Sequence, residues 1–198
     1  MTDPAPPRLL LVAGVPRSGS TWAFNAARRL LGQAPGGLHA AWVADRDPHH
    51  PARTHLVKAH QPGEVDFAPD LVLTTRRAAE ECLASLIRMG WLADDPAAIR
   101  RAWVHHNRLY TSWKARSDHE ISYAGMIADP ARELTRLAAA LKVDLSAQDA
   151  GRIAAELAAM EAPETGTYDP ETLLHPGHRA APGAAGRRAE EILRLLQG

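Results

Sequence analysis

Apolar residues along this chain fall into two patterns: short continuous runs, and stretches in which they recur three and four positions apart. The continuous runs are of strand length and predict strands at 9–13, 55–60 and 70–75, and the short stretch His-Glu-Ile-Ser-Tyr predicts a fourth strand at 119–123. The second pattern predicts helices, which are expected at 22–31, at 79–87, from 96 onward, between 147 and the proline at 163, and at 190–196. Strands that alternate with helices indicate an α/β fold, a doubly wound and mostly parallel sheet of four to five strands that binds its ligand at the carboxyl ends of the strands.

One long segment lacks both patterns. From Gly32 to Arg53 the chain is rich in Gly, Pro, His and Asp, and we expect an irregular loop there. Loops of this length are commonly functional, so this one is a candidate wall for a substrate pocket. His49 and His50 have no cysteine or carboxylate at ligand spacing, so we interpret them as solvated loop residues and predict no metal site.

The composition narrows the class of protein. The 198 residues are 45% hydrophobic, which is enough for one domain spanning 1–198. Lys plus Arg and Asp plus Glu balance at 23 each, so no broad field favours nucleic acid or an anionic membrane. The N-terminus has no basic region and the first apolar run is too short to span a bilayer, so neither a signal peptide nor a membrane span is predicted. The single cysteine, Cys82, excludes an intrachain disulfide and fits a reducing cytoplasm.

The first predicted strand runs into a turn of small residues and then into a helix. Gly14, Gly19 and Thr21 have the spacing of the Gly-x-x-x-x-Gly-x-Thr loop that binds ATP phosphates. Ser20 stands where that loop has its lysine, and the cation is Arg17 instead. Backbone N–H groups of the turn and the helix N-terminus predict a phosphate site. An adenylate-type donor held by an arginine fits these residues, and so does a generic nucleotide-binding fold.

Residues 15–22, Val-Pro-Arg-Ser-Gly-Ser-Thr-Trp, resemble the 5′-phosphosulfate loop of the sulfotransferases that use 3′-phosphoadenosine 5′-phosphosulfate (PAPS). The resemblance is to a small bacterial-type member of these P-loop sulfotransferases, and it implies that Arg17 contacts the leaving group of the donor. It also implies that the rest of the loop binds the donor, through Ser18, Gly19, Ser20, Thr21 and Trp22, with the tryptophan stacked on the adenine.

A second resemblance lies at the end of the next predicted strand. Lys58-Ala59-His60-Gln61-Pro62 is similar to the Lys-Thr-His-x-Pro motif of cytosolic sulfotransferases, with alanine in place of the threonine. The resemblance implies that His60 is the general base on the acceptor and that Lys58 contacts the donor. Alternation along a strand places these two side chains on one side of the sheet. The alternative interpretation is an exposed histidine at the end of a strand.

The junction after the third predicted strand resembles the family's 3′-phosphate site. Arg77 and Ser85 have the family's spacing of eight positions, with Glu81 where an aspartate is usual. Arg76 competes with Arg77 for this role. Two arginines at the start of a helix oppose its dipole unless an anion binds there. Further along, Tyr123 resembles the tyrosine that approaches the adenine in the family, although the glutamate that normally follows is alanine here.

The glycine-rich tail carries the last resemblance. The stretch from Gly183 to Gly186 resembles the family's C-terminal Gly-x-x-Gly loop, which closes over the 3′-phosphate. The aspartate and tryptophan that usually follow this loop are Arg187 and Arg188 here, and the resemblance implies a phosphate contact from Arg187. A flexible, low-complexity tail is the alternative interpretation.

Together these residues predict an enzyme. The resemblance implies PAPS-dependent transfer of a sulfuryl group to a hydroxyl or amine of a small-molecule acceptor, without a metal and with adenosine 3′,5′-bisphosphate (PAP) as the second product. His60 would take the proton of the acceptor, while Arg17 and Lys58 would neutralise charge on the transferred group and the leaving oxygen. Two alternatives stay open: a Mg²⁺-dependent P-loop kinase-like phosphotransferase, and a nucleotide-binding module without catalysis.

Overall fold

Five parallel strands form one sheet at the centre of the molecule. The computed structural model describes residues 6–33, 35–176 and 184–197. The strands are β1 (Arg8–Ala13), β2 (Leu38–Trp42), β3 (Thr54–Ala59), β4 (Leu71–Arg76) and β5 (His119–Ser122). Their order in the sheet is β2-β3-β1-β4-β5, and every neighbouring pair is parallel. The carboxyl end of β1 therefore lies between those of β3 and β4.

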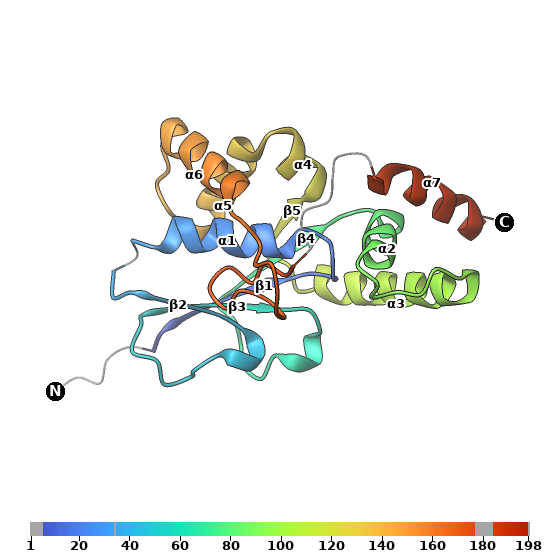
Figure 1. Cartoon of the computed structure of the whole chain (residues 1–198). Coiled ribbons are helices and arrows are strands. Elements are labelled where there is room, and N and C mark those ends of the chain that lie inside the picture. The colour runs from blue at the N-terminus through green and yellow to red at the C-terminus, as the bar shows by residue number, and fades with distance from the viewer. Residues whose placement is uncertain (1–5, 34, 177–183, 198) are drawn as a thin grey trace.

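Helices cover both faces of the sheet (Figure 1). They are α1 (Ser20–Leu31), α2 (Ala79–Arg88), α3 (Pro96–Lys114), α4 (Tyr123–Ala128), α5 (Pro130–Leu141), α6 (Ala147–Ala159) and α7 (Ala184–Gln197), with short 3-10 helices η1 (Val43–Asp45) and η2 (Pro62–Glu64). Leu10 and Val12 of β1 are buried with α1, α5 and α6, whereas Leu11 and Ala13 are buried with α3 on the other face. A strand that is apolar on both faces explains the continuous run in the sequence. Within the described ranges, no helix combines the length and the apolar character that crossing a bilayer requires.

The doubly wound, parallel α/β fold predicted from the sequence is confirmed, with a correction between Gly32 and Arg53. The sequence predicts an irregular loop there, but the segment contains β2 and η1. β2 is an edge strand that pairs with β3, and the register aligns Trp42 with Lys58. Its Leu-His-Ala-Ala-Trp sequence contains no β-branched residue, so the neighbouring strand rather than local preference makes it extended.

The strand predicted at 119–123 is one residue shorter than expected. Tyr123 is the first residue of α4 instead of the last residue of a strand. Ser122 provides the reason, because its side chain accepts a hydrogen bond from the N–H of Gly125 and so caps a new helix at this point. The change of direction brings the tyrosine ring to the end of the sheet.

The last helix is longer than predicted. α7 begins at Ala184 and not near 190, so Gly186 and Arg187 belong to a helix and not to a loop. Alanine favours a helix, and contacts of α7 with α2 and α3 bury one side of it. Gly183 lies outside the described residues.

Candidate functional site at the ends of the strands

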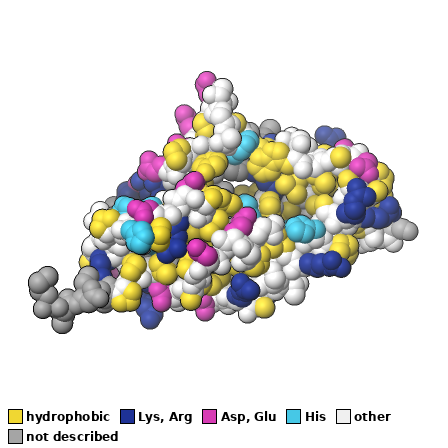
Figure 2. Space-filling model, turned by 90° about the horizontal axis from the view of Figure 1, so that it is seen from below, with side chains coloured by type: hydrophobic (Ala, Val, Ile, Leu, Met, Phe, Trp, Pro, Cys, Tyr) yellow, Lys and Arg dark blue, Asp and Glu magenta, His cyan; other side chains and the backbone are white. Residues whose placement is uncertain are grey.

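A cavity of about 630 Å³ opens at the carboxyl ends of the strands. Each strand contributes a lining residue, either from its own end or from the connection that follows it. These residues are Arg17 after β1, Trp42 in β2, Lys58 in β3, Arg77 after β4 and Tyr123 after β5. Seen from below, the molecule is hollowed near its middle, and hydrophobic side chains gather beside the hollow (Figure 2). Doubly wound sheets bind their ligands in this position, so the cavity is the candidate site.

The loop between β1 and α1 has the backbone of a phosphate-binding turn. Arg17 and Gly19 have positive φ angles of 71° and 99°, the kind of alternation that forms anion-binding concavities. α1 begins at Ser20, so the N–H groups of its first turn have no partners within the helix. Gly14 is required for close packing, because a Cβ atom there would lie 2.2 Å from Oγ1 of Thr75. The loop therefore sits directly on β4.

Ser18 differs from the other residues of this loop because it does not line the cavity. Its buried Oγ donates to the carbonyl oxygen of Val15 at 2.7 Å and lies 2.5 Å from Oγ1 of Thr75. The N–H of Ser18 also donates to the carbonyl oxygen of Val15. Its side chain thus holds the loop in shape and faces away from a ligand.

Three cationic side chains line the cavity, and no carboxylate does so among the residues that the structure describes. The three are Arg17, Lys58 and Arg77. Lys58 is only 4% exposed, and its Nζ donates to Oγ1 of Thr21 at 3.0 Å. Burial, and then the charge of Arg17, lowers the pKa of Lys58 to about 7. Burial, and then Arg88 and Arg77, lowers the pKa of Arg17 to about 10. Neighbouring positive charges thus lower the pKa of both Lys58 and Arg17, and such a group of cations favours an anionic ligand.

His60 lines the cavity directly after β3. Its Nδ1 donates to the carbonyl oxygen of Gly14 at 2.7 Å, which leaves Nε2 as the basic nitrogen of the neutral ring. The ring meets Trp42 edge-on, with 5.2 Å between the centroids. Nε1 of Trp113 donates to the carbonyl oxygen of His60 at 2.8 Å. Burial, and then the charge of Lys58, lowers the pKa of His60 to about 3, so its imidazole is neutral at pH 7.

Of the two adjacent arginines after β4, Arg77 lines the cavity and Arg76 does not. The guanidinium of Arg77 lies 3.9 Å from the ring centroid of Tyr123. It also donates to the carbonyl oxygen of Arg17 at 3.0 Å. Arg76 instead forms an ion pair with Glu120, and its side chain is 59% exposed. The structure therefore favours Arg77 over Arg76 as the arginine available to a ligand in this cavity.

Helix α2 holds both cavity arginines in place. Oγ of Ser85 accepts a hydrogen bond from Nε of Arg17 at 2.9 Å. Oε2 of Glu81 accepts one from Nε of Arg77, also at 2.9 Å. Ser85 is itself buried and lies behind the arginines without lining the cavity. The spacing of Glu81 and Ser85 by one helical turn thus fixes two guanidinium groups from different loops.

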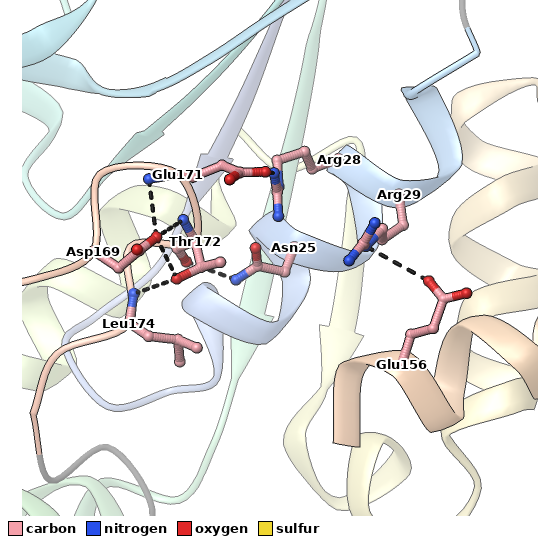
Figure 3. Close-up of polar contacts among 8 residues, drawn as sticks. All are labelled: Asn25, Arg28, Arg29, Glu156, Asp169, Glu171, Thr172 and Leu174. Carbon is pink, nitrogen blue, oxygen red and sulfur yellow. Dashed lines mark hydrogen bonds and ion pairs between the residues drawn. The ribbon is translucent and has the colours of Figure 1, made fainter. Parts of the chain in front are cut away.

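A segment far along the chain, residues 168–175, completes the cavity. Its lining residues are Tyr168, Leu173, Leu174 and His175. Asn25 of α1 holds the segment by donating to the carbonyl oxygen of Thr172 at 2.7 Å, and Arg28 of the same helix is paired with Glu171 (Figure 3). The helix that begins at the phosphate-binding turn therefore also anchors this wall.

No protein-family model matches the sequence, and no curated protein is significantly similar to it. Among solved structures, the chain resembles the crystal structure of mouse sulfotransferase SULT7A1 complexed with PAP. The TM-score is 0.63 at 15% sequence identity, and the match covers 95% of this chain and 82% of the other. The chain has a sulfotransferase fold.

The sulfotransferase fold brings most of the residues singled out in the sequence to one place. Those that line the cavity are Arg17, Gly19, Ser20, Thr21, Trp22, Lys58, His60, Arg77 and Tyr123. Gly186 and Arg187 are exposed on α7 and do not line it. A contact between Gly183 and a ligand falls outside the described residues.

Sequence reasoning found Trp22 and Tyr123 but missed three other aromatic residues of the lining. Trp42, Trp91 and Tyr168 all line the cavity. Trp91 is 48% exposed and lies over the guanidinium of Arg17, with 5.7 Å between the guanidinium carbon and the ring centroid. A usable signal was present, because Trp91 and Tyr168 belong to no predicted helix or strand. An aromatic residue that no core face accounts for is a candidate ligand contact.

Proposed function

We propose that this chain transfers a sulfuryl group from PAPS to a hydroxyl or amine of a small molecule. The observation that carries the proposal is that one cavity contains a phosphate-binding turn, a buried lysine, two half-buried arginines and a neutral histidine. The shared fold supports it, since the similar solved sulfotransferase is complexed with PAP. Cavities at the ends of parallel strands suit a ligand whose phosphates need backbone N–H groups and fixed cations.

The two charged ends of the donor would be held by different parts of the site. The N–H groups at the start of α1, together with Arg17 and Lys58, would hold the 5′-phosphosulfate. Arg77 would hold the 3′-phosphate, while Ser85 would act from behind the lining by fixing the guanidinium of Arg17. Tyr123 would keep the guanidinium of Arg77 in position through the stacking seen in the structure. The remaining aromatic lining would flank the adenine.

In the transfer step, His60 would act as the general base. Its Nε2 takes the proton of the acceptor hydroxyl as the acceptor oxygen attacks sulfur. The new S–O bond forms while the S–O bond to the bridging phosphate oxygen breaks, and the electron pair leaves with PAP. Arg17 and Lys58 would neutralise the charge that develops on this oxygen. The carbonyl group of Gly14 orients the base, and catalysis of this kind contributes on the order of 10²- to 10⁴-fold.

The same residues weigh against the alternatives. A P-loop kinase uses a lysine on the β- and γ-phosphates and a carboxylate on Mg²⁺, whereas Ser20 stands at the position of that lysine and no carboxylate is among the described residues that line the cavity. A silent binding module has no need of a neutral histidine whose Nδ1 is fixed by a backbone carbonyl group. Sulfuryl transfer needs no carboxylate for a metal, and it uses the neutral histidine as a base.

The proposal is tested by incubating the purified protein with PAPS and a panel of hydroxyl and amine acceptors, with and without EDTA. Mass spectrometry should find products that gain one sulfuryl group, at equal rates in both conditions. His60→Ala should lose this activity but keep its affinity for PAP in calorimetry, while His49→Ala, in an exposed loop, should resemble the wild type. Equal affinities for PAP and AMP, with no sulfated product from any acceptor, would contradict the proposal.

A further inference from the structure

Lys58 is buried with few hydrogen-bond partners. An ammonium group carries three N–H donors. Among the described residues, Nζ makes one hydrogen bond, to Oγ1 of Thr21 at 3.0 Å. The ring of Trp42 lies beside it, with its centroid 5.4 Å from Nζ. The cation–π contact with Trp42 favours the ammonium form, but a single acceptor among the described residues leaves two of its three N–H donors without a hydrogen bond.

The positive charges around Lys58 also disfavour its ammonium form. Arg17 faces it from the turn after β1, and Arg77 lines the same cavity after β4, while the neutral His60 follows directly after β3. The described lining contains no carboxylate. Burying an ammonium ion without a counterion is costly, and nearby positive charges add to that cost. The low pKa of Lys58, about 7, has these two causes.

We propose that Lys58 is largely neutral in the ligand-free protein above pH 7 and takes up a proton when a phosphate-bearing nucleotide enters the cavity. This inference rests on the proposed function, since the anion that recharges Lys58 is the phosphosulfate of PAPS or the 5′-phosphate of PAP. The proton comes from the solvent, and the resulting ammonium group pairs with a phosphate oxygen. Release of PAP returns the proton to the solvent. Lys58 therefore takes up one proton and releases it again in each cycle of binding and release.

The size of the coupling follows from the two protonation equilibria. With a pKa of about 7, Lys58 is charged in roughly one tenth of ligand-free molecules at pH 8. If the bound anion restores the ordinary value of 10.5, the bound form is almost fully charged. About 0.9 proton is then taken up per PAP at pH 8, and the affinity for PAP falls about tenfold per pH unit from pH 8 to 9.5.

The experiment is titration calorimetry with PAP at pH 8, in uncharged or cationic buffers that differ in ionisation enthalpy. The slope of binding enthalpy against ionisation enthalpy counts the protons, and we expect about 0.9 for the wild type. Lys58→Arg and Lys58→Met cannot titrate here, so their slopes should be near zero. Lys114→Met, which replaces an exposed lysine of α3, should keep the wild-type slope. His60→Gln should keep it too, which separates Lys58 from the histidine.

The possible failures are distinguishable. If the wild type binds PAP no better than AMP, the donor assignment is refuted and this inference with it. If PAP is preferred but the wild-type slope is zero, or if Lys58→Arg keeps a slope of about 0.9, the coupling to Lys58 is refuted while the donor site stands. The pH dependence of PAP affinity in the wild type gives the same answer without a variant that has to fold.

Discussion

Acid should destabilise the folded protein through two histidines that remain neutral inside it. Burial, and then the charge of Lys58, lowers the pKa of His60 to about 3. Burial, and then His105, lowers the pKa of His106 to about 4. Their ordinary value is 6.5. Below pH 6.5 the unfolded chain therefore binds protons that the folded chain does not, and the free energy of unfolding falls as the pH drops.

The loss can be estimated from these values. One pH unit corresponds to about 1.4 kcal/mol per histidine. Between pH 6.5 and 4.5 each histidine then removes about 2 kcal/mol from the free energy of unfolding, and the two together about 4 kcal/mol. That is a large share of the roughly 5–15 kcal/mol that stabilises a typical domain. Staying above pH 4.5 keeps most carboxylates ionised, so their titration contributes little.

The assay is urea unfolding at pH 7.0, 5.5 and 4.5. His60→Gln and His106→Gln should each lose about 2 kcal/mol of the acid-induced change, and the double variant should lose about 4 kcal/mol of it. His49→Gln, in an exposed loop, is the matched control and should follow the wild type. If the single variants keep the full pH dependence, the two buried imidazoles are not the source of acid sensitivity.

Three other changes test the site itself. Arg77→Ala should weaken PAP more than AMP in calorimetry, because the 3′-phosphate loses its arginine, whereas Arg76→Ala should not alter the preference; the reverse result would move the phosphate site. Gly14→Ala should lower the free energy of unfolding by about 1–3 kcal/mol, since its Cβ would lie 2.2 Å from Oγ1 of Thr75; an unchanged melting temperature would show that the loop can move away. Arg17→Ala should reduce both PAP affinity and turnover, and a loss of affinity alone would remove this residue from the transfer step.

The charged part of the site was predictable because it depends on local sequence. A turn between a buried strand and a helix needs glycine and small residues, and strand alternation alone sets Lys58 and His60 on one side. The same local logic explains the strands found as apolar runs; β1, for example, is covered on both faces. It did not separate Arg76 from Arg77, because the direction of each side chain depends on Glu120 and Tyr123, which lie on other elements.

The rest of the aromatic lining was not predictable, because long-range contacts determine it. β2 is extended because β3 lies beside it, and this pairing is what brings Trp42 into the lining. Tyr168 is positioned by a hydrogen bond of 2.5 Å from its hydroxyl to Oδ2 of Asp45, a residue 123 positions earlier. Neither contact leaves a periodic pattern in the sequence around the residue that it positions.

The lining of the cavity runs from Pro16 to His175, so the site exists only when nearly the whole chain has folded. A molecule that binds there stabilises the folded state by mass action, and PAP at 100 times its dissociation constant should add about 2.7 kcal/mol to the free energy of unfolding. A rise in melting temperature is therefore a readout of occupancy that requires no turnover. Because the acceptor would share this cavity, compounds that raise the melting temperature further in the presence of PAP become a short list of acceptors, drawn up before any sulfated product has been detected.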